Sequence, residues 1–150
     1  MRKTACLIAL ACLALPALSG PARPPRSAEP EHVTVQHILI AFRGSLPGDQ
    51  KVTRSQADAE KLALQIFERA KAGEDFAAMV KTYTNDSFPG IYKMANAGVP
   101  LDPSNQEFSR TRMVKAFGDV SFGLEVGGVG LAVYDPATSR FGWHIIKRLE

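Results

Sequence analysis

Two histidines within apolar, strand-like segments are the residues in this sequence best suited to chemistry. His37 lies within residues 33–41, and His144 lies within residues 141–150. A neutral imidazole carries one hydrogen-bond donor and one acceptor, so the two rings can bond each other if their strands are neighbours. A histidine in an apolar strand can equally be a satisfied core residue, and that alternative stays open.

A metal-binding protein would need the same two histidines as ligands. No acidic or thiolate side chain lies close to either of them in the sequence, so we expect no metal site. Asp86, in the polar turn Asn85-Asp86-Ser87, is a third candidate for chemistry, although residues of this type also serve simply as turns and caps. The chain has no serine in a nucleophile elbow and no phosphate-binding loop, so we expect no cofactor.

These side chains must be positioned by a mixture of strands and helices. Residues 33–41 alternate so that Val35, His37 and Leu39 share one face of a predicted strand. The helices and the later strands are segregated along the chain, which favours an α+β fold with a mostly antiparallel sheet. The sequence predicts further strands over residues 91–95, 129–134 and 140–149, and helices over residues 53–72, from 74 through 83, and over 110–117.

Helix boundaries follow from residues that suit helix ends. Thr53 and Gln56 fit a capping box at the start of the first helix, and Gly73 ends it. Glu74 and Asp75 then favour a second helix start, because negative charge there complements the helix dipole.

The composition suits one soluble globular domain. The chain has 150 residues, of which 45% are hydrophobic and 22% charged. Both cysteines, Cys6 and Cys12, lie near the N-terminus, which excludes a disulfide framework for the rest of the chain. The net charge is +3, and Arg2 and Lys3 supply two of these charges. The charge therefore gives no reason to expect nucleic-acid binding.

The N-terminal residues resemble an export signal. Residues 1–19 combine a basic start, an apolar segment that is too short for a membrane anchor, and small residues near Ser19, where we expect cleavage. A lipoprotein attached through Cys12 and a buried core helix are the alternatives. Residues 20–32 are rich in proline and predict a disordered spacer, which leaves a globular domain over residues 33–150. We expect an exported protein, periplasmic or secreted, without a stable membrane span.

Four segments, in order, resemble the parvulin-type peptidyl-prolyl isomerases. They are HILIAF at 37–42, GEDFAAMVKTYTND at 73–86, FSRTRMVKAFGDVSFGLEVG at 108–127 and FGWHIIKRLE at 141–150. The resemblance covers essentially all of residues 33–150. It implies a four-stranded, mostly antiparallel sheet surrounded by about four helices, as in the parvulin and FKBP-like folds.

The resemblance also implies roles for individual residues. His37 and His144 would be the paired histidines beneath the reacting bond, and Asp86 would occupy the position where the family has Asp or Cys. Met113 and Phe117, which the predicted helix would place on one face, would wall the proline pocket. Met94, Phe122 and Ser139 complete the implied substrate-binding set, Ser139 because Phe141 stands where the family often has Ser or Thr.

The implied activity is non-covalent rotation of X-Pro bonds in proline-containing polypeptides, by a monomer that needs no cofactor. A non-catalytic, parvulin-like chaperone module is the alternative. Arg43 is the only cation in the loop after the first strand before Lys51, so we expect no requirement for a phosphorylated residue before proline.

Overall fold

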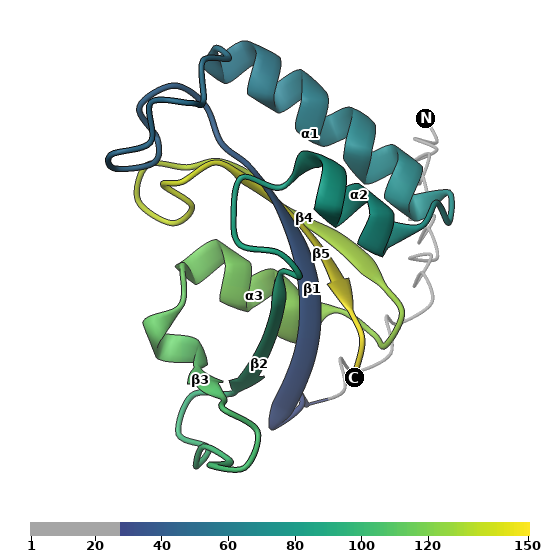
Figure 1. Cartoon of the computed structure of the whole chain (residues 1–150). Coiled ribbons are helices and arrows are strands. Elements are labelled where there is room, and N and C mark those ends of the chain that lie inside the picture. The colour runs from purple at the N-terminus through teal and green to yellow at the C-terminus, as the bar shows by residue number, and fades with distance from the viewer. Residues whose placement is uncertain (1–27) are drawn as a thin grey trace, which may run out of the picture.

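Five strands, three α-helices and one short 3-10 helix make up residues 28–150, the part of the chain that the computed structural model describes. The predicted leader and most of the predicted spacer lie outside these residues. No helix in residues 28–150 is long and apolar enough to span a membrane. The elements, in chain order, are β1 (His32–Ile40), α1 (Gln56–Lys71), α2 (Phe76–Tyr83), β2 (Ile91–Ala95), β3 (Phe108–Ser109), η1 (Arg110–Arg112), α3 (Lys115–Gly123), β4 (Val129–Ala132) and β5 (Trp143–Arg148) (Figure 1).

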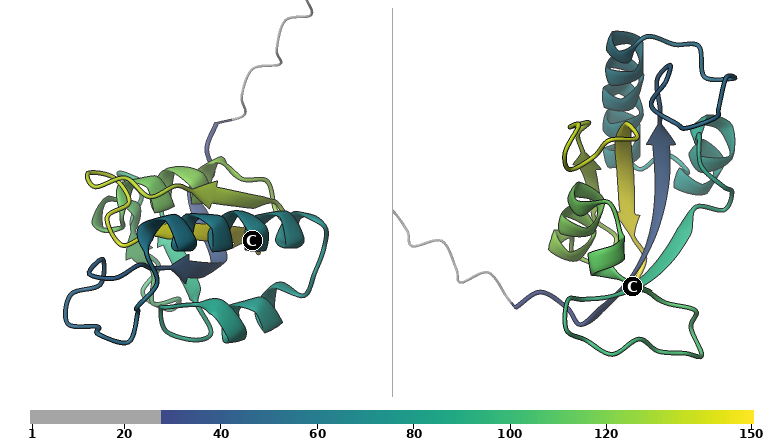
Figure 2. Two further views of the ribbon diagram at one scale, coloured as in Figure 1. Left: turned by 90° about the horizontal axis from the view of Figure 1, so that it is seen from above. Right: turned by 90° about the vertical axis from the view of Figure 1, so that its left-hand side faces the viewer.

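The strands form one sheet in the order β3-β2-β1-β5-β4. β1 lies in the middle, antiparallel to both β2 and β5, and only the contact between β2 and β3 is parallel. Figure 2 shows β1 and β5, the first and last strands of the chain, side by side. The α+β class and the mostly antiparallel sheet are confirmed. The sheet has five strands rather than the expected four, because the two-residue strand β3 adds to one edge.

The alternation along β1 separates two apolar clusters, one on each face of the sheet. Ile38 and Ile40 pack with α1 and α2 on one face, whereas Val33 and Val35 pack with α3 on the other. His37 belongs to the second face, where its ring lies against Phe117 of α3. The histidine is therefore held between the central strand β1 and α3.

The first two helices begin where a side chain can accept a hydrogen bond from the helix backbone. Asp75 caps α2, as its sequence position predicts, by accepting a bond from the Ala78 amide. The cap of α1 is Ser55, which accepts from the Asp58 amide, and not the predicted Thr53. Either hydroxyl could cap a helix, but Ser55 has an acidic residue three positions later, within the first turn.

The segment around residues 110–123 differs from its predicted form. The sequence predicts a helix over 110–117, but the chain makes the short η1, extends through Met113 and Val114, and begins α3 only at Lys115. α3 then continues past Gly118 and ends at Gly123, although glycine is a poor helix former. Burial of its apolar side against the sheet outweighs that cost, because tertiary packing supplies most of the stability of a short helix.

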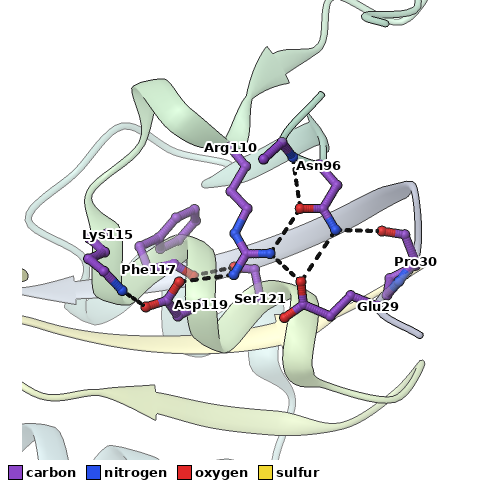
Figure 3. Close-up of polar contacts among 9 residues, drawn as sticks. Glu29, Pro30, Asn96, Arg110, Lys115, Phe117, Asp119 and Ser121 are labelled. Carbon is purple, nitrogen blue, oxygen red and sulfur yellow. Dashed lines mark hydrogen bonds and ion pairs between the residues drawn. The ribbon is translucent and has the colours of Figure 1, made fainter. Parts of the chain in front are cut away.

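The chain enters the domain through a polar cluster that we call the entry clamp: Glu29, Pro30, Asn96, Arg110 and Asp119 (Figure 3). The Asn96 side-chain amide donates to the Pro30 carbonyl at 3.0 Å. The Arg110 guanidinium donates to Glu29, to the Asn96 side-chain oxygen at 2.9 Å and to Asp119 at 2.9 Å. The clamp thus joins the residues before β1 to the end of β2, to η1 and to α3.

Candidate active site

The two histidine rings lie side by side on the sheet face that α3 covers. In the β1–β5 ladder, His144 lies opposite Leu39, and His37 lies opposite Ile146, so the two rings are diagonal neighbours. Their Nδ1 atoms are 3.3 Å apart, and their rings stack with centroids separated by 5.4 Å. The sequence-based expectation that the imidazoles can bond each other is confirmed.

Asp86 reaches His37 from the loop that follows α2. Its Oδ2 atom lies 2.9 Å from His37 Nε2 and accepts a second bond from the Tyr92 hydroxyl at 2.7 Å. The loop is fixed to β1, because the Asn85 amide donates to the Leu39 carbonyl at 2.8 Å. The sheet and the loop together therefore hold a polar chain that runs from His144 through His37 and Asp86 to Tyr92.

The hydrogen-bond partners of these side chains determine which nitrogen or oxygen atoms carry a proton. Hydrogen bonding from His37 and from Tyr92 holds the pKa of Asp86 well below its usual range, so the carboxylate is ionised and can only accept. His37 then donates from Nε2, which leaves its Nδ1 to accept from His144 Nδ1 when the His37 ring is neutral. Burial lowers the pKa of His144 to about 3, and His144 Nε2 is buried without a hydrogen-bond partner in residues 28–150. His144 is therefore neutral at physiological pH.

Burial also raises the pKa of the Tyr92 phenol, and its hydrogen bond to ionised Asp86 raises that pKa further. Tyr92 therefore stays protonated and donates to the carboxylate. Its ring packs edge-on against His37, with centroids 5.1 Å apart.

A cavity of about 360 Å³ opens over this polar chain. Phe117 forms part of its floor, with its ring centroid 5.1 Å from that of His37 and 5.5 Å from that of His144. Met113, just before α3, also lines the cavity, although it lies outside the helix on which the sequence placed it. The apolar lining is completed by Leu39, Leu46, Val114 and Phe141.

The cavity thus brings together five of the eight residues that the sequence analysis proposes for the site. They are His37, Asp86, His144, Met113 and Phe117. The arrangement offers an apolar surface beside neutral and acidic hydrogen-bonding groups, and no nucleophile is activated by the contacts described.

The structure places the other three elsewhere. Met94, a residue of β2, is fully buried. Its side chain packs in the core between the sheet and α3, with Val33 and Val35. Phe122 is buried five residues beyond Phe117 on α3, under the Arg110 guanidinium.

Ser139, the third of these residues, is fully buried in a turn, where its hydroxyl donates to the Gly142 carbonyl at 2.9 Å. It makes no hydrogen bond to a histidine. Phe141, which stands where the parvulin family often has Ser or Thr, lines the cavity.

Three further residues at the site were not identified from the sequence. Tyr92 lies in a strand whose pattern indicates only burial, and the Asp86 contact depends on loop geometry that no spacing rule gives. Arg112 lines the cavity, and its position next to Met113 was the one available signal. Arg54, at the end of the loop after β1, was not assigned to the site, and it donates to Asn85 at the cavity edge.

No cluster of three or more potential metal ligands occurs within the described residues 28–150.

Comparison with known proteins gives consistent results. The family model described as the PPIC-type PPIase domain matches residues 25–150. Foldase protein PrsA 4 of Bacillus cereus is 40% identical over 88 residues, which cover 59% of this chain and 27% of that protein. Chaperone SurA of Hahella chejuensis is 34% identical over 117 residues, which cover 78% of this chain and 22% of that protein. The chain thus spans about a quarter of the length of these curated relatives.

Solved structures with the same fold include PrsA from Bacillus subtilis and the peptidyl-prolyl isomerase ESS1 from Candida albicans. The first has a TM-score of 0.50 and 25% identity, covering 80% of this chain and 35% of the other. The second has a TM-score of 0.53 and 21% identity, covering 80% and 63%, and bears on the fold alone.

Proposed function

Because the chain belongs to the family of PPIC-type peptidyl-prolyl isomerase domains, we propose that it accelerates the cis–trans rotation of X-Pro bonds in polypeptides. The reaction needs no covalent intermediate and no cofactor. The observation that carries the proposal is the cavity in which Met113 and Phe117 lie beside the polar chain formed by His37, Asp86 and His144.

The apolar walls favour the transition state. Rotation about an X-Pro bond passes through a twisted amide, and the barrier of about 18–20 kcal/mol reflects lost conjugation. The twisted amide is less polar than the planar one, so an apolar, water-poor cavity destabilises the planar amide relative to it. Met113 and Phe117 would grip the pyrrolidine ring, and each tenfold gain in rate asks for only about 1.4 kcal/mol.

The polar chain would fix the shape and the electrostatics of the cavity. Buried, neutral His144 holds His37 from one side, and ionised Asp86 holds it from the other. Both rings are thereby kept in one orientation under the substrate. The Asp86 charge, held in place by Tyr92, would set the field near the substrate carbonyl.

The test is a direct isomerisation assay on a short peptide that contains one proline. We expect the protein to raise the exchange rate between the cis and trans forms, measured by magnetisation transfer, in proportion to its concentration. A protein that binds the peptide but leaves the exchange rate unchanged would contradict the proposal.

That contrary outcome would favour the second candidate, a polypeptide-binding chaperone module. The observation behind it is the similarity to proteins named as chaperone and foldase. Suppression of aggregation of an unfolded protein, in the absence of isomerase activity, would identify this role. In either role we propose polypeptide substrates that have been exported, since the leader predicted over residues 1–19 would direct the chain across a membrane.

A further inference from the structure

Arg112 lines the cavity, and nothing in residues 28–150 engages its guanidinium. Arg140, next to the cavity-lining Phe141, also lacks an ion pair within these residues, but its guanidinium stacks 4.8 Å from the centroid of the Phe141 ring. Arg112 is exposed, and it makes no ion pair or side-chain hydrogen bond within those residues. It directly precedes Met113, the residue proposed to contact the proline ring. A free positive charge therefore stands at the site that would hold the substrate.

The neighbouring cations along the same segment are already paired. Arg110 donates to Glu29 and to Asp119, and Lys115 also pairs with Asp119. Arg112 lies between these two residues in sequence and has no such partner within the described chain.

The arginines at the two ends of the loop after β1 are also hydrogen-bonded. Arg43 donates to the Thr53 carbonyl at 2.8 Å. Arg54 donates to the Ala41 carbonyl at 3.0 Å and to the Asn85 side-chain oxygen. Neither guanidinium has the freedom of Arg112, although each retains further N–H groups.

No hydrogen bond or ion pair joins Arg112 to the one carboxylate among the described residues that line the cavity. Asp86 is the only acidic residue among those lining it, and its Oδ2 atom already accepts from both His37 and Tyr92. An anionic group on a bound peptide would thus meet an unpaired cation at the rim.

We propose that Arg112 is a specificity-determining residue that selects peptides with an anionic side chain next to the proline. This inference rests on the proposed binding of proline peptides in the cavity. The anion can be the carboxylate of glutamate or aspartate, or a phosphate. One exposed guanidinium supplies a modest preference, about twofold to fivefold for a carboxylate, and not a requirement.

The test uses matched tetrapeptides of the form Ala-Xaa-Pro-Phe, with Xaa as glutamate, glutamine, lysine or phosphoserine. A second series places the same residues after proline. Both the dissociation constant and the isomerisation rate are measured for each peptide, so that a preference is detected whether or not the protein catalyses. We expect glutamate to exceed glutamine in one of the two series, and the difference to shrink in about 0.5 M salt.

Three variants locate the source of the preference. Arg112→Gln should bring the glutamate-to-glutamine ratio close to one, and Arg112→Glu should make lysine the favoured residue. Lys61→Gln is the matched control, because it removes the same charge from an exposed position on α1, which packs on the opposite face of the sheet. It should retain the wild-type ratio.

The outcomes separate the two proposals. Catalysis without any charge preference, or a preference that persists in Arg112→Gln, would overturn the role of Arg112 and leave the isomerase intact. Binding that prefers glutamate through Arg112, without catalysis, would support the role of Arg112 and overturn the isomerase. A preference of a hundredfold or more for phosphoserine would show that several cations converge on the site, contrary to the single-cation proposal.

Discussion

Met113 is the residue through which the proposed proline pocket can be tested with least damage to the fold. It is half-buried and lies outside a helix, whereas Phe117 is only 2% exposed and belongs to the core. Phe117→Ala would therefore cost about 3–5 kcal/mol of stability, so a loss of activity could not be separated from a loss of folding.

We expect Met113→Ala to lower kcat/KM at least about tenfold, as the loss of about 1.4 kcal/mol of transition-state stabilisation implies, while the protein stays folded by circular dichroism. Leu64→Ala, an exposed apolar position on α1, should leave kcat/KM unchanged. Normal activity in Met113→Ala would mean that this side chain only packs against its neighbours.

His144 should make stability depend on pH. Because burial lowers its folded-state pKa to about 3, the unfolded chain binds a proton below about pH 6.5 that the folded protein does not. The free energy of unfolding then falls as the pH drops below 6.5, by at most about 1.4 kcal/mol per pH unit from this group. Asp86, whose folded-state pKa is also depressed, adds a loss in the same direction below about pH 4.

Urea unfolding at a series of pH values measures this slope. We expect His144→Leu to flatten it between pH 6.5 and pH 4. Ile145→Val is the control, because Ile145 is equally buried in β5 and carries no titrating group, so its variant should lose stability but keep the slope. An unchanged slope in His144→Leu would show that other groups dominate the acid response.

At the scale of elements, the entry clamp joins parts of the chain that are distant in sequence. The Arg110 side chain is 18% exposed, and its guanidinium also lies 4.8 Å from the centroid of the Phe122 ring. We expect Arg110→Met to lower the free energy of unfolding by about 1–3 kcal/mol, because several hydrogen bonds to charged groups are lost together.

Lys115→Met is the matched control for this experiment. It removes a cation that pairs with the same Asp119, but the Lys115 side chain is 69% exposed. The loss should stay within about 0.5 kcal/mol, as for most surface ion pairs. Equal losses in the two variants would mean that the clamp adds nothing beyond ordinary surface charge pairing. Both are measured by urea unfolding.

The elements also show how far the sequence alone could lead. Alternation along β1 correctly assigned His37 to one face with Val35 and Leu39, because the side-chain period of a strand is independent of its partners. The start of α3 could not be predicted in the same way. Its position depends on burial of Phe117 against the sheet, which is a long-range contact that local propensity does not contain.

The candidate site shows the same division. Its histidines and Asp86 were candidates from their residue types and positions, and the family resemblance supplied their roles. Tyr92 and Arg112 were not proposed from the sequence, because their places at the site depend on contacts in space. Tyr92 joins the site because the loop after α2 brings Asp86 within 2.7 Å of its hydroxyl. Arg112 stands out because it lines the cavity while the neighbouring cations are paired. Met94 is the opposite case: it was proposed for the substrate-binding set, but its side chain is buried in the core.

At the scale of the whole molecule, the chain corresponds to about a quarter of each of the two relatives described. Its described domain contains one cavity with an apolar lining beside a buried histidine pair. Within this domain, the cavity and its rim, including Arg112, are the surface through which we propose that polypeptides are bound.

Export, if it occurs as the sequence predicts, would determine which polypeptides the cavity meets. The leader predicted over residues 1–19 has the basic start, the short apolar segment and the small residues near Ser19 that a signal peptidase reads. We expect mature protein from the native host to begin near Gly20, as measured by intact-mass spectrometry. A lipid-modified chain that begins at Cys12 would instead support the lipoprotein alternative, and a chain that retains Met1 would contradict export. Removal near Gly20 would leave a proline-rich segment of about ten residues before the entry clamp, and its composition predicts an extended spacer. The cavity would then stand free among newly exported chains, whose X-Pro bonds are slow to rotate without a catalyst.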